Sequence, residues 1–139
     1  MTAQRADILI LNGKKQALLA TPLDIYLAAS NNSKRFTPQS TNLWRGYVAT
    51  WSIQKNHLYL LSVQGWISHN PEPQEAMGLL FPDHKGPVFA HWVSRSLRVA
   101  DGPLFDYVHQ GFGRRFKHEL VFELWNGEII EQKRVTYDS

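Results

Sequence analysis

The stretch LWRGYVATWSIQKNHLYLLSV, residues 43–63, decides the fold class. It is rich in aromatic and β-branched residues, which favour strands, and the polar residues Gln54–His57 divide it in two. We predict an antiparallel hairpin with Ile53 opposite Leu58 and with two apolar faces. One face carries Leu43, Tyr47, Ala49, Trp51, Leu58 and Leu60, and the other carries Trp44, Val48, Tyr59, Leu61 and Val63. Such a hairpin belongs at the centre of a sheet, covered on both sides.

An Asn-Gly pair near the start of the chain predicts a second hairpin. Asn12-Gly13 separates Asp7–Leu11 from Lys15–Leu19. Asn and Gly tolerate the positive backbone φ angles of a type I′ turn, whose twist matches that of the two flanking strands. We therefore expect a tight two-residue turn here.

The segment TPLDIYLAAS, residues 21–30, predicts a short helix. Thr21 suits the N-cap, Pro22 suits the first helical position, and Asp24 lies where a negative charge favours the helix dipole. The apolar face of this helix of about two turns is formed by Leu23, Tyr26 and Leu27.

A second Asn-Gly pair predicts a hairpin near the other end. Asn126-Gly127 separates Glu119–Trp125 from Glu128–Val135. An uninterrupted ladder from a two-residue turn places Glu119 opposite Arg134, a favourable cross-strand pair of opposite charge.

Two segments lie between the central hairpin and the last one. Residues 69–87 contain four prolines and are expected to be irregular, with one helical turn around Glu75–Leu80. The run PVFAHWVSRSLRV, residues 87–99, predicts a strand with His91 and Arg95 on one face. Its other face would carry Trp92, Ser94, Ser96 and Arg98.

The composition indicates one folded unit. The chain has 139 residues, of which 43% are apolar and 12% aromatic, enough for a packed core. We predict a single domain over residues 1–139 of the α+β class, mostly β, with one mainly antiparallel sheet of about seven to nine strands and one or two short helices.

The absence of cysteine and the lack of long apolar stretches limit where in the cell the protein is expected. The absence of Cys excludes disulfides, thiolate metal sites and a cysteine nucleophile. The apolar run near the start is too short for a signal peptide, and no stretch approaches the roughly 18 apolar residues of a membrane span. We expect a cytoplasmic protein without a membrane partner.

The segment HQGFGRRFKH, residues 109–118, is the most suggestive basic feature. Arg114 and Arg115 can each hold phosphate or carboxylate with two hydrogen bonds, His109 adds a further donor, and the glycines let backbone N–H groups approach an anion. The alternative is a connecting loop with solvated charges. The net charge of +3 is mild for a protein that binds nucleic acid, so that partner is possible but not favoured.

Arg45, Tyr47 and Trp51 fall on one face of a predicted strand, and a sheet face with Arg beside aromatic rings can bind a ligand or a partner. The alternative is an inward aromatic cluster from which Arg45 reaches water. His91 and Arg95 form a second candidate pair. Whether Trp44, Trp51 and Trp92 are core or surface residues is left open by the pattern.

No catalytic, metal or cofactor motif stands out. Ser94 lacks the strand–turn–helix setting of a nucleophile elbow, and the histidines lack the spacing of metal ligands. The carboxylates of Asp101 and Asp106 could pair in space, but nothing local in the sequence places them together. We expect no cofactor and no metal, although distant residues can converge into an active site.

The strings WRGYVATW (44–51), WVSRSLR (92–98) and YVHQGFG (107–113) resemble those of a family of small, uncharacterised bacterial proteins. The resemblance spans residues 43–116. It implies a bacterial source and a stand-alone domain with an accessory role, such as an immunity or adaptor protein.

These observations together predict a non-catalytic bacterial protein that recognises a partner protein. The candidate binding residues are Arg45, Tyr47, His91, Arg95, His109, Arg114 and Arg115. One alternative is a binder of an anionic small molecule or nucleic acid through an aromatic and arginine-rich surface, and another is an enzyme acting on an anionic substrate.

Overall fold

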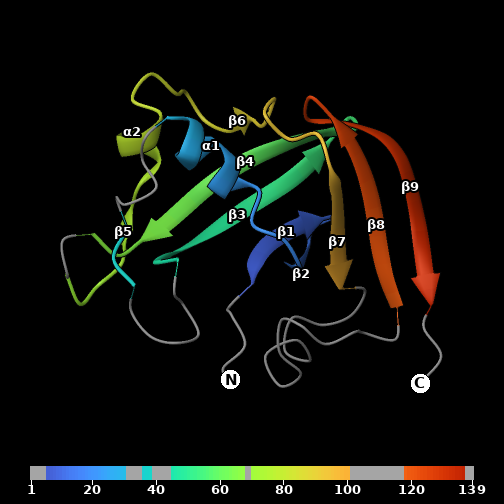
Figure 1. Ribbon diagram of the computed structural model, residues 1–139, viewed down its shortest axis with the longest axis horizontal. Coiled ribbons are helices and arrows are strands. Elements are labelled where there is room, and N and C mark those ends of the chain that lie inside the picture. Colours follow the sequence, from blue (N-terminus) through green and yellow to red (C-terminus); the bar gives the residue numbers. More distant parts are fainter. Residues whose placement is uncertain (1–5, 31–35, 39–44, 68–69, 101–117, 137–139) are drawn as a thin grey trace.

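Strands dominate the structure, as the aromatic and β-branched composition predicts. The computed structural model describes residues 6–30, 36–38, 45–67, 70–100 and 118–136, and in these ranges one sheet of nine strands is accompanied by two short helices (Figure 1). In chain order the elements are β1 (Asp7–Leu11), β2 (Lys14–Leu18), α1 (Leu23–Ala29), β3 (Tyr47–Gln54), β4 (His57–Gly65), β5 (Gln74–Glu75), α2 (Met77–Leu80), β6 (Val88–Phe89), β7 (Ser96–Ala100), β8 (His118–Trp125) and β9 (Glu128–Thr136). The predicted α+β, mostly β class is confirmed.

Seven of the strands close into a barrel, which an open single sheet would not do. Their order is β3-β1-β2-β7-β8-β9-β4, and β4 pairs back onto β3. The β1–β3 pair is parallel and the other pairs are antiparallel. Two of the strand pairings consist of one residue pair each. β2 pairs with β7 at Leu18 and Val99, and β4 pairs with β9 at His57 and Glu128. Inward side chains fill a barrel of this size and form its core.

The central hairpin is formed as predicted by β3 and β4. Ile53 lies opposite Leu58, and β3 is flanked by β1 on one side and by β4 on the other. Leu43 and Trp44, which were expected to begin the first strand, lie outside the described residues. Trp51 is fully buried and belongs to the core.

A β-bulge in this hairpin changes which side chains face the core. The register shifts between Thr50 and Trp51, and β4 carries one extra residue there, Leu61. A bulge reverses the alternation of inward and outward side chains beyond it. Val63 therefore points inward and is fully buried, and the prediction that it lies on the face opposite Trp51 is wrong.

The first hairpin and the helix are confirmed with small shifts. β2 begins at Lys14, directly after the Asn12-Gly13 turn, whose two residues both have positive φ. The helix has Pro22 rather than Thr21 at its N-cap position, and the Thr21 hydroxyl donates a 2.9 Å hydrogen bond to Asp24 instead of accepting one from the backbone. Its predicted apolar face packs on the core, with two leucines buried and the tyrosine partly buried.

The last hairpin also forms, but its predicted register is wrong. A bulge between Glu123 and Leu124 leaves Ile130 as an extra residue on β9, so Glu119 lies opposite Val135 and not opposite Arg134. Glu119 is instead bound by Arg98 of β7, through hydrogen bonds of 2.9 Å from Nε and 2.6 Å from Nη2.

The strand expected over residues 87–99 is broken into β6 and β7. A turn at His91 and Trp92 lies between them, and the chain there crosses from β4 to the Asn126-Gly127 turn. Ala90 N donates to Leu58 O at 2.9 Å, and Gly127 N donates to Val93 O at 2.8 Å. The predicted common face of His91 and Arg95 is therefore not formed, because hydrogen bonds to β4 and to the Asn126-Gly127 turn fix the backbone of this segment.

We predict that the two Asn-Gly turns respond differently to a methyl group. Gly13 and Gly127 have φ angles of +78° and +82°, but a Cβ on Gly127 would lie 2.5 Å from Ala90 O, whereas a Cβ on Gly13 would meet nothing within 4 Å. Gly13→Ala should cost about 1–2 kcal/mol, from the left-handed backbone alone. Gly127→Ala should cost about 1–3 kcal/mol more, because the neighbouring backbone must move. Urea denaturation of the matched pair measures both, and equal losses would contradict the close approach at Gly127.

Candidate functional site

A buried polar network occupies the interior of the barrel. The Asp7 carboxylate has no solvent exposure and lies at the start of β1. Its Oδ1 accepts hydrogen bonds from Arg45 Nη2 at 2.7 Å and from Ala49 N at 3.1 Å, and its Oδ2 accepts one from Trp51 Nε1 at 3.1 Å. All three donors come from β3 or the residues just before it. The carboxylate therefore ties β1 to β3.

The network continues from Arg45 to the helix. The guanidinium lies over the ring of Tyr47, 5.0 Å from the ring centroid, and the Tyr47 hydroxyl donates a 2.6 Å hydrogen bond to Asp24 Oδ1. Asp24 lies in the first turn of α1. One chain of polar contacts thus joins β1, β3 and α1 through the barrel.

Burial governs the electrostatics of this network. Desolvation raises the pKa of Asp7, and the Arg45 charge and the donors Ala49 N and Trp51 Nε1 oppose that rise. Burial, with the charges of Asp7 and Asp24, also raises the pKa of Tyr47. Asp7, Arg45 and Tyr47 hold one another and face little solvent, and only Asp24, at the end of the network, is exposed. The buried part of this arrangement stabilises the barrel.

The placement of Arg45 and Tyr47 corrects the expected exposed platform. The Arg45 side chain is 11% exposed, and Tyr47 and Trp51 are buried. The three residues do share one face, as predicted, but that face is the interior of the barrel. The inward aromatic cluster of the alternative is present, but Arg45 does not extend to water as that alternative expected, because it binds Asp7 in the interior.

A second cluster, which we call the aromatic strip, extends from the core to the surface. Its members are linked by ring contacts with centroid separations of 4.6 to 6.5 Å. The strip consists of Tyr26, Phe81, Trp92, His91, Phe89, Tyr59 and His57. It begins on α1, passes over the loop after α2 and the turn after β6, and ends on β4.

The inner part of the strip is fixed by hydrogen bonds. Trp92 Nε1 donates to Pro22 O at 2.9 Å, and the Tyr26 hydroxyl donates to Leu80 O at 3.3 Å. Trp92 also makes an edge contact with the core residue Trp51, with 6.3 Å between ring centroids. The strip is therefore held by the core and is not a set of loose surface rings.

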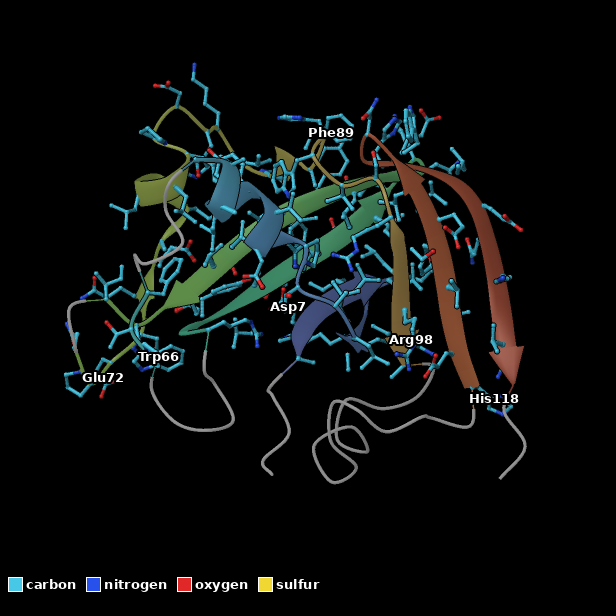
Figure 2. All side chains as sticks on the ribbon, viewed as in Figure 1. Asp7, Trp66, Glu72, Phe89, Arg98 and His118 are labelled. Carbon is cyan, nitrogen blue, oxygen red and sulfur yellow. The ribbon has the colours of Figure 1, made fainter. Side chains whose placement is uncertain are left out.

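The outer part of the strip reaches the surface beside the tip of the β8–β9 hairpin. Phe89 is 37% exposed and contacts both His57 and His91, while the tip carries Trp125, which is 63% exposed. Glu128 of β9 lies between the hairpin tip and the strip, because it pairs with Trp125 on one side and with His57 on the other. Figure 2 shows that Phe89 lies at the end of the molecule opposite Arg98 and His118.

The remaining predicted residues fall elsewhere. Arg95 is exposed, near β8, where its carbonyl accepts a 3.0 Å hydrogen bond from Leu124 N. His109, Arg114 and Arg115 lie outside the described residues, so the basic segment stays a prediction. Within the described ranges, no group of three or more His, Asp or Glu side chains is arranged to hold a metal ion.

Sequence reasoning missed two parts of this picture. Asp7 opens an alternating apolar strand at an inward position, and a charge at such a position signals a buried partner. The sequence pattern places Phe89 and Trp125 in strands, and no local pattern shows that Phe89 and the β8–β9 tip meet. Their proximity depends on the broken strand between β6 and β7.

Comparison of the chain with models of protein families, with characterised proteins and with solved structures yields no match in any of the three. The resemblance of the three sequence strings to a bacterial family therefore stays a prediction. Over the part of the chain that the structure describes, no helix has the length and apolar character needed to cross a membrane.

We predict that Arg45→Met lowers stability in a pH-dependent way. Removing one partner of a buried ion pair costs about 3–5 kcal/mol at neutral pH. Loss of the guanidinium raises the pKa of Asp7 further, so the folded variant keeps a proton that the unfolded chain releases near its ordinary pKa. Stability then falls as pH rises between those two values, by at most about 1.4 kcal/mol per pH unit.

Urea denaturation between pH 4 and pH 8 measures this effect. The loss relative to the unchanged protein should be smallest near pH 4 and should grow toward neutral pH. The double variant Asp7→Asn with Arg45→Met is the control, because without the carboxylate this growth should disappear. A loss that is the same at every pH would show that Asp7 is not the group that titrates.

Proposed function

We propose that this protein is a non-catalytic binding protein that recognises a partner protein through the outer part of the aromatic strip. The observation that carries the proposal is the exposed Trp125 at the tip of the β8–β9 hairpin, where Gly127 lies against the ring of Phe89. We define the docking face by the residues Tyr59, Phe89, His91 and Trp125.

The chemistry of this face suits a protein partner. Trp and Tyr are enriched among the residues that dominate binding energy at protein interfaces, because they offer large apolar area with few rotatable bonds. Phe89 is already held between His57, Tyr59 and His91, so little conformational freedom is lost when it is covered. A rigid aromatic group at the surface is a favourable anchor for a complementary pocket.

The charges around the docking face favour a protein over an anion. Glu128 lies between Trp125 and His57, and a carboxylate there disfavours a phosphate or a nucleic acid backbone. The sequence resemblance suggests, more specifically, an accessory role in the bacterial cytoplasm, as an immunity or adaptor protein.

Affinity capture with exposed-site variants tests the proposal. We expect the unchanged protein to recover a protein partner from a bacterial lysate, and Phe89→Ser or Trp125→Ser to lose at least nine-tenths of it, about tenfold or more in affinity. The matched control is Leu79→Ser on α2, which removes another exposed apolar side chain. All three changes should leave the thermal midpoint within a few degrees, as is usual for surface positions.

Two results would contradict the proposal. The first is a partner that all three variants retain equally, which would place the interface elsewhere on the protein. The second is recovery that falls steeply with salt and depends on nucleic acid, which would indicate recognition of phosphates instead.

A further inference from the structure

β9 has one long edge that the barrel does not use. Its nine residues pair with β8 along one edge, but along the other edge they pair with β4 only at Glu128. Figure 1 shows β9 diverging from β4 beyond that point. Residues 131–134 are exposed. The second edge of β4 is covered by β5 and β6, and for the edge of β9 from Ile130 to Lys133 no further strand partner is described.

One cross-strand contact on this part of the sheet is unfavourable in the isolated chain. Glu131 of β9 lies directly opposite Glu123 of β8. Like charges that face each other across strands are destabilising. The Ser96 hydroxyl donates to the Glu123 carboxylate at 2.6 Å, but it brings no positive charge. A cation placed on the other side of Glu131 would relieve this repulsion.

β9 itself carries such a cation two residues further on. Lys133 lies opposite Val121, and Glu131 and Lys133 point to the same, outer face of the barrel. A Lys on an edge strand often serves only to prevent pairing with other chains. Here, however, the charges alternate in sign along one face, and this makes the edge complementary to itself in the antiparallel direction.

We propose that β9 pairs antiparallel with β9 of a second copy of this chain, in a two-fold symmetric dimer centred on Gln132. In this arrangement Glu131 of each copy lies opposite Lys133 of the other. Each Glu131 then has Glu123 on one side and a lysine on the other. The proposal is independent of the docking face, of which only Trp125 belongs to the β8–β9 hairpin.

Symmetry restricts the register strongly. A two-fold axis that relates two neighbouring antiparallel strands is perpendicular to the sheet, so residues that pair across it point to the same face. The axis lies midway between two copies of the same residue, and that residue defines the register. An axis through Glu131 or through Lys133 sets identical charges opposite each other. Of these three neighbouring registers, only the one centred on Gln132 pairs a glutamate of one copy with a lysine of the other.

The expected dimer is weak. Pairing of two short edges buries less than the roughly 1,200 Å² at which stable interfaces begin. We therefore expect a dissociation constant in the micromolar range or above, with mass that depends on concentration and association that weakens with salt.

Sedimentation equilibrium of the full chain over about 10 μM to 1 mM, at low salt, tests the pairing. The unchanged protein should pass from one chain to two as its concentration rises. Lys133→Glu and Glu131→Lys should each weaken self-association at least tenfold, because each sets like charges opposite each other. A mixture of these two variants should associate again, since every pair in the mixed dimer joins a glutamate and a lysine.

The control is Lys14→Glu on β2, which makes the same change in net charge at an exposed position away from β9 and should leave association unchanged. Circular dichroism of each variant confirms that the fold is intact. A protein that stays monomeric throughout the range overturns the proposal. So does a dimer that both single variants retain, or a mixture that fails to associate, because either result places the contact elsewhere.

Discussion

The Asp7 carboxylate is the interaction on which the barrel depends. Burying a charge without partners costs far more than one side chain can return, so Asp7 is tolerated only where donors surround it. Arg45, Ala49 N and Trp51 provide those donors, all from one stretch of chain around the start of β3. They specify that β1 lies beside β3, and this parallel pair is the step that turns a meander of hairpins into a closed ring.

The same network fixes what lies on the outside. The Tyr47 hydroxyl donates a hydrogen bond to Asp24, and this bond holds the first turn of α1 against the barrel. Pro22, directly before α1, accepts a hydrogen bond at its carbonyl oxygen from Trp92 Nε1. Trp92 lies in the turn after β6, so this bond fixes the position of that turn. The aromatic strip is thus positioned by residues that never reach its exposed end. The buried ion pair and the aromatic strip therefore both depend on one arrangement of strands.

The parts of the fold that local chemistry determines could be predicted from the sequence. The two Asn-Gly turns, the Gln54–His57 turn and the short helix after Thr21 each depend on a few adjacent residues, and each forms where expected. Whatever depends on distant partners could not be predicted. The bulges at Leu61 and Ile130 shift the registers because strands must coil to close a barrel, and alternation along one strand contains no trace of that.

The candidate site follows the same division. Arg45 and Tyr47 were correctly placed on one face, but the side of the barrel to which that face belongs depends on Asp7, 38 residues away from Arg45. Phe89 and Trp125 come from segments that meet only because the backbone between β6 and β7 is bonded to two strands at once. Closure of the barrel buries both edges of most strands but leaves β4 and β9 joined at a single pair. That incomplete seam ends beside the docking face and leaves the charged edge of β9 beyond it. Both surfaces that we propose for contacts with other chains therefore lie at the place where the described strands close the ring least completely.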